Sequence, residues 1–94
     1  ASDVYKRQAL IETLQMLVAG NETSSNALTW VFHLLSQHPD HVAAIRAEVG
    51  RVIGDAPVDP AMLHRLEHSA RVVHEALRLY PPFWMIDRIA LQDD

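Results

Sequence analysis

Apolar residues recur almost all the way round the stretch from about Gln8 to His38, with no broad polar face between them. An apolar surface this wide, continued over about thirty residues, predicts a long helix that is buried on several sides. Such a helix would span on the order of 45 Å, which is longer than a domain of this size can cover. Pro39 ends the run, because proline lacks the N–H group that a helix interior needs.

Two shorter helices are expected next. The second helix has apolar positions three and four residues apart, and Gly54 suits its C-terminal stop. Those apolar positions are Val42, Ile45, Val49 and Val52. Asp59 followed by Pro60 suits the N-cap and the first position of a short third helix, which we expect to run through Leu66.

The last part of the chain is expected to hold one more helix and one strand. The helix runs from about Ser69 to Tyr80 and is ended by Pro81 and Pro82. Beyond it, residues 83–92 (FWMIDRIALQ) place aromatic and branched side chains in partial alternation and form the one strand candidate. The chain as a whole is therefore predicted to be mainly α.

The composition excludes several classes of protein. The 94 residues suit one small domain, and 49% apolar residues are enough for a modest core. A net charge of −4 gives the chain no excess of positive charge with which to bind nucleic acid or an anionic membrane. Without cysteine, the chain can form no disulfide, no thiolate metal site and no cysteine nucleophile. No apolar run reaches about 18 residues, so no membrane span is expected.

The centre of the long helix carries an unusual polar segment, AGNETSS. Gly20 costs a helix about 1 kcal/mol relative to alanine, and it leaves room for something flat to approach the backbone. The hydroxyl of Thr23 can bond the carbonyl of Ala19, four residues back. Two interpretations remain open from the residues alone. The segment is either a polar stripe on a solvent face, or it sets Glu22 and Thr23 beside a bound planar group as a proton relay.

The segment HEALR begins at His74 and has four of the five letters of the zinc motif HExxH. Arg78 stands where the second imidazole should be, and a permanent cation cannot bind a metal. His64 and His68 could share a helix face but lack a third ligand, so no metal site is expected. Glu75 and Arg78 can pair on one face, which in an exposed helix contributes a few tenths of a kcal/mol. The double-proline turn that follows favours a partly buried pair instead.

The chain resembles the cytochrome P-450 family of haem-thiolate monooxygenases through three motifs in the same order. They are AGxET in a glycine-bearing helix, then ExLRLYPP, then R-x-A. Residues 19–39 resemble the long central helix of that family, and residues 66–94 resemble its ExxR helix with the strand after it. The resemblance implies a partial domain over residues 8–94 that is incomplete at both ends. Residues 1–7 fit it poorly and are expected to be a non-native or disordered lead-in.

The resemblance implies roles for the polar segment. Ala19 and Gly20 would lie against the haem and the oxygen site, and Thr23 would contact the cofactor there. Glu22 and Thr23 would be the acid–alcohol pair that delivers protons to the oxygen site, so that O–O cleavage leads to water rather than to released peroxide.

It also implies roles beyond that segment. Glu75 and Arg78 would be the structural pair behind the haem, needed for folding and haem retention, and Arg88 would bind a haem propionate. The residues that would follow into the substrate pocket are Phe83, Trp84, Met85 and Ile86. For those four, core packing of a strand remains an equal alternative.

The implied cofactor is haem b, whose axial cysteine lies outside this chain, so the chain alone should be inactive. The implied partners are O₂, a small lipophilic substrate and an electron donor, which is a ferredoxin, a flavodoxin or a flavin reductase, separate or fused. No nucleic-acid partner is expected, and the resemblance favours a cytoplasmic, bacterial-type enzyme. The alternative is a small all-helical interaction or scaffold domain whose motifs match by chance.

Overall fold

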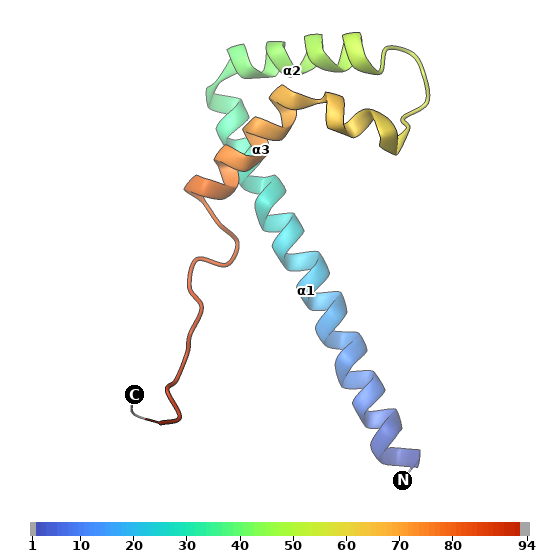
Figure 1. Cartoon of the computed structure of the whole chain (residues 1–94), viewed down its shortest axis with the longest axis vertical. Helices are drawn as coiled ribbons and strands as arrows, with labels where there is room; N and C mark the ends of the chain where they lie inside the picture. The colour runs from blue at the N-terminus through green and yellow to red at the C-terminus, as the bar shows by residue number, and fades with distance from the viewer. Residues whose placement is uncertain (1, 93–94) are drawn as a thin grey trace.

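The computed structural model describes residues 2–92. In order along the chain, its helices are α1 (Ser2–Gln37), α2 (Pro39–Val52), the short 3₁₀ helix η1 (Pro60–Arg65) and α3 (Glu67–Leu79). In Figure 1, α1 is a long rod, α2 runs across its C-terminal end, and α3 returns to cross α1. From residue 80 to residue 92 the chain has neither helix nor strand. The prediction of a mainly α chain is confirmed.

The predicted helix boundaries have the expected local causes. α1 ends just before Pro39, which becomes the first residue of α2. α2 is closed at Gly54, which has a φ of 58° and donates its N–H to the carbonyl of Val49 at 3.1 Å. This left-handed conformation strongly favours glycine. Asp59 caps η1, since its Oδ1 accepts from the N–H of Ala61 at 2.9 Å.

The small core lies where α3 crosses α1. Val31 of α1 and Ala76 of α3 are the buried hydrophobic residues of the described chain, with 7% and 2% of their surface exposed. Next to them the rings of Trp30 and Tyr80 stack at 4.0 Å between centroids, 8° from parallel. This stack ties α1 to the residue that ends α3, so it fixes the point from which the following segment leaves.

α1 begins earlier than the start near Gln8 that was expected for the long helix. Residues 2–7 form its first turns, and residue 1 lies outside the described part. No glycine or proline occurs between Ser2 and Ala19, and the helix therefore has no local reason to begin later.

The strand expected over residues 83–92 is wrong. These residues have no regular secondary structure, and residues 2–92 contain no strand at all. A strand needs a neighbouring strand to satisfy its N–H and C=O groups, and the described chain offers only helices. Alternating side chains alone could not supply that partner.

The burial expected for α1 is also not reached within the described chain. Leu17 is 64% exposed and Phe32 67%, and most other apolar positions of α1 are similar. No helix in the stretch from residue 2 to residue 92 is long and apolar enough to cross a membrane.

Candidate functional site

One face of α1 and the segment after α3 border an open pocket with a volume of about 510 Å³. The residues from α1 recur at the spacing of a single helix face. The lining residues are Leu14, Gln15, Val18, Ala19, Glu22, Thr23, Pro82 and Phe83. The fold thus brings three predicted site residues of the AGNET segment together with Phe83, about sixty positions later in the chain.

Thr23 and Glu22 present different polar groups to this pocket. The hydroxyl of Thr23 donates to the carbonyl of Ala19 at 2.7 Å, as predicted, and the side chain is half-buried. This bond fixes the hydroxyl oxygen while leaving its lone pairs able to accept a proton donor. Glu22 is exposed and can exchange protons with water. Together they can bind a proton donor and pass protons between solvent and the pocket.

Gly20 lies on α1 next to this face but does not line the pocket. A Cβ atom placed on it would have no atom within 4 Å, apart from the neighbouring residues and the backbone of the helix itself. The backbone at Gly20 therefore faces open space, as a surface that receives a flat group must.

Glu75 and Arg78 pair on α3 as predicted. Arg78 donates from Nε to Glu75 Oε2 at 2.7 Å and from a terminal nitrogen to Oε1 at 2.5 Å. The two parallel bonds lower the pKa of the Glu75 carboxyl and raise that of the Arg78 guanidinium. Their side chains are 54% and 66% exposed, so the burial expected for the pair is not reached within this chain.

The remaining predicted site residues do not meet in this pocket. Trp84, Met85 and Ile86 follow Phe83 but do not line it, and all three are exposed. Arg88 is exposed further along the same segment and pairs with no carboxylate among residues 2–92. Of the four substrate-lining candidates, Phe83 is the one that lines this pocket, and it is 71% exposed itself.

Sequence reasoning missed one buried ionic group, Glu48 of α2. Glu48 is 4% exposed, and its carboxylate accepts from the N–H of His68 at 2.7 Å and from the N–H and hydroxyl of Ser69 at 2.9 and 2.7 Å. Burial acts to raise the pKa of Glu48, but these three bonds outweigh it and hold the pKa at about 2. Its position in the sequence could have predicted this burial, because Glu48 follows Ile45 by three residues and precedes Val52 by four, which puts it on the apolar face of α2.

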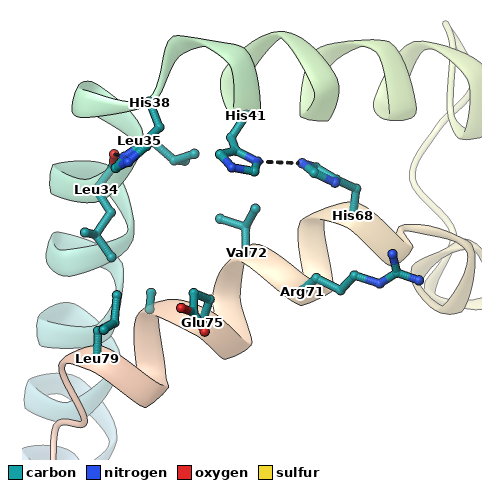
Figure 2. Close-up of a pocket in the computed structure, with 10 residues that line it drawn as sticks. Leu34, Leu35, His38, His41, His68, Arg71, Val72, Glu75 and Leu79 are labelled. Carbon is teal, nitrogen blue, oxygen red and sulfur yellow. Dashed lines mark hydrogen bonds between the residues drawn. The ribbon is translucent and has the colours of Figure 1, made fainter.

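A second pocket, of about 580 Å³, lies where the three helices meet (Figure 2). Its lining includes leucines of α1, Val72 of α3 and three histidines. The ring of His41 on α2 bonds that of His68 on α3, with 3.2 Å between Nδ1 and Nε2. The stretch that the structure describes brings together no group of three or more residues able to hold a metal ion.

Comparison with known proteins places this sequence in one family. Residues 2–94 match the family model for cytochrome P-450. The chain is 39% identical over 92 residues to Protein LUTEIN DEFICIENT 5, chloroplastic, from Arabidopsis thaliana, which covers 98% of the chain and 16% of that protein. It is 38% identical over 82 residues to pentalenene oxygenase from Streptomyces avermitilis, covering 87% of the chain and 18% of the relative.

A third relative is cyclooctat-9-en-7-ol 5-monooxygenase from Streptomyces melanosporofaciens, with 38% identity over 82 residues, 87% of the chain and 18% of that protein. The chain thus spans less than a fifth of the length of these relatives. No solved structure matches it.

A match over nearly the whole chain contradicts the alternative of a scaffold domain with chance motifs. The chain belongs to the cytochrome P-450 family.

Proposed function

We propose that the full-length protein containing this chain is a haem-dependent monooxygenase. It would insert one atom of O₂ into a lipophilic organic substrate and reduce the other atom to water. The observation that supports the proposal is the pocket that Glu22 and Thr23 line together with Phe83. Proton-transfer groups and apolar side chains around one pocket suit the insertion of oxygen into a lipophilic molecule.

The family implies a haem iron cofactor, and the described residues fit one side of it. Ala19 lines the pocket, and the backbone at Gly20 faces open space, so a flat group could lie against this part of α1. Arg88 carries a cation that could bind a propionate, which needs the segment after α3 to lie near the group. The chain has no cysteine, so an axial thiolate would come from elsewhere in the protein. When bound, the haem supplies the oxygen-activating chemistry.

The residues of this chain would then control protons and substrate. Thr23, held by its bond to Ala19, would accept a proton donor inside the pocket. Glu22 would take up protons from solvent and pass them to the pocket, because its side chain is exposed. Leu14, Val18 and Phe83 would give the pocket an apolar lining that favours an apolar substrate. Glu75 and Arg78 would stabilise the fold behind the haem.

The names of two relatives support this class of reaction, because one is an oxygenase of pentalenene and the other a monooxygenase of cyclooctat-9-en-7-ol. We propose a lipophilic substrate of similar kind and an electron donor that is a ferredoxin, a flavodoxin or a flavin reductase. A cytoplasmic location stays a prediction from the family resemblance.

The test uses the full-length protein, reduced and exposed to carbon monoxide. A thiolate-type Soret shift is expected. With ¹⁸O₂, an electron donor and pentalenene as the probe, a product carrying one labelled oxygen atom is expected. A protein that binds haem but lacks the shifted band would contradict the proposal.

A further inference from the structure

The first turn of α3 lacks the cap that a helix of this kind needs. The first N–H groups of any helix have no partner within it, and they usually bond a side chain just before the helix. Leu66 occupies that position and has no side-chain acceptor to offer. The first bond inside the helix runs from the N–H of Ala70 to the carbonyl of Leu66, which leaves the preceding amides to other partners.

Those partners come from another helix. The N–H groups of His68 and Ser69 donate to the two different oxygens of Glu48, at 2.7 and 2.9 Å, and the hydroxyl of Ser69 adds a third bond at 2.7 Å. Glu48 lies twenty positions earlier, on α2. A carboxylate bonded to the amides of a helix N-terminus also faces the positive end of the helix dipole.

The burial of Glu48 shows that this contact is specific. The carboxylate of a residue that is only 4% exposed is unfavourable unless its oxygens accept hydrogen bonds, and here three donors provide them. Both oxygens are used, so the carboxylate and the first turn of α3 have one mutual orientation. The lowered pKa of Glu48 agrees, since the bonds outweigh the effect of burial.

A second link joins the same two helices at the same turn. Figure 2 shows the rings of His41 and His68 pointing toward each other from α2 and α3, joined by their 3.2 Å bond. His68 therefore contacts α2 through both its backbone and its side chain. The start of α3 is held at two points, neither of which lies on α1.

We propose that Glu48 is a positioning residue, which anchors the first turn of α3 and thereby sets where the Glu75–Arg78 pair lies. α3 is a short, continuous helix, and Glu75 follows His68 by seven residues, so an anchor at its start fixes the direction of the rest. The consequence for haem retention rests on the function proposed above. The contact between Glu48 and the first turn of α3 does not depend on that function.

The experiment compares three variants of the full-length protein. Glu48→Gln keeps the size of the side chain but removes its charge and one acceptor. Ser69→Ala removes one of the three donors. Glu67→Gln is the matched control, because it makes the same chemical change on the first turn of α3, where Glu67 is exposed and only approaches Arg71 at 3.7 Å.

The first measurement is hydrogen–deuterium exchange in a peptide that covers the first turn of α3. Loss of a charge-assisted bond should raise exchange by about tenfold in Glu48→Gln. Ser69→Ala should raise it less, and Glu67→Gln should leave it unchanged. Unaltered exchange in Glu48→Gln would overturn the anchor. If that variant does not fold, a raised exchange in Ser69→Ala supports the anchor and an unaltered exchange overturns it.

The second measurement is the rate of haem transfer to apomyoglobin, at a temperature where circular dichroism shows every variant folded. Faster transfer is expected from Glu48→Gln and not from Glu67→Gln. Raised exchange with an unchanged transfer rate would overturn the positioning role. A wild-type protein without the thiolate-type carbon monoxide band would instead refute the proposed function, while the exchange measurement would still decide the anchor.

Discussion

Thr23 and Thr29 make the same hydrogen bond on the same helix but stand in different surroundings. Each hydroxyl donates to the carbonyl four residues back at 2.7 Å, and only Thr23 lines the pocket beside Glu22. We expect Thr23→Ala in the full-length protein to keep its haem and to form about tenfold less product per electron pair consumed, because proton delivery is impaired. Product and consumed cofactor, measured together, give the ratio. Thr29→Ala should keep the wild-type ratio, and equal uncoupling in both variants would refute the relay.

Two arginines of α3 allow a similar comparison. Arg78 bonds Glu75 through two nitrogens, whereas Arg71 only approaches Glu67 at 3.7 Å. We expect Arg78→Ala to lose haem or folded protein, because the pair is proposed to stabilise the fold behind the haem in the full-length protein, where Glu75 would be left without its cation. Haem content per folded protein measures this. Arg71→Ala should retain the wild-type content. A folded, haem-loaded and active Arg78→Ala protein would show that the pair has no such role.

The end of α2 depends on the backbone of one glycine. Gly54 has a φ of 58°, whereas Gly50 lies inside the helix with nothing within 4 Å of its Cβ position. We expect Gly54→Ala to lower the free energy of unfolding by about 1 kcal/mol, because an alanine is strained there. Gly50→Ala should raise that free energy by a similar amount, about 1 kcal/mol. Urea titration of the full-length protein measures both, and a shared sign would contradict the explanation.

Helix ends could be predicted from sequence because their causes are local. Pro39, Gly54 and Asp59 each act within a few residues, and each has the expected effect. The local sequence could not decide whether residues 83–92 form a strand, because a strand also needs a neighbouring strand as its hydrogen-bond partner. Glu48 was missed for a related reason, since its donors lie twenty positions away. The pocket at AGNET needed a family resemblance, because no local pattern brings Phe83 to Thr23.

The contact between α2 and α3 should depend on pH through Glu48. The pKa of Glu48 is about 2 in the folded chain, against an ordinary value of 4.5. A lowered pKa stabilises the folded state above the unfolded value and loses this contribution as pH falls toward the folded value. We therefore expect the stability difference between wild type and Glu48→Gln to be constant above about pH 6 and to shrink between pH 4.5 and 2. Urea titrations at several pH values measure it, and a pH-independent difference would contradict this account.

The molecule as a whole organises its site with very little core. Val31 of α1 and Ala76 of α3 are both buried, and after the aromatic stack of Trp30 and Tyr80 the chain passes to the face of α1 that carries AGNET. The pocket is therefore bounded by a long helix on one side and by a segment without regular structure on the other. Its shape depends on how firmly α3 is held, and this is why the anchor at Glu48 matters for the site.

The same small core predicts how the 94-residue chain behaves alone. Val31 and Ala76 are the buried hydrophobic residues of the described part, while large side chains such as Phe32 and Leu17 remain mostly exposed. The free energy gained from so little apolar burial cannot offset the conformational entropy that the chain loses on folding. The chain alone should therefore not unfold in a single cooperative transition. We expect a broad thermal melt by circular dichroism, with strong binding of a hydrophobic dye at temperatures below it. Sedimentation shows whether the chain associates through these faces. A sharp cooperative melt from a monomer without dye binding would show that the three helices form a stable unit by themselves.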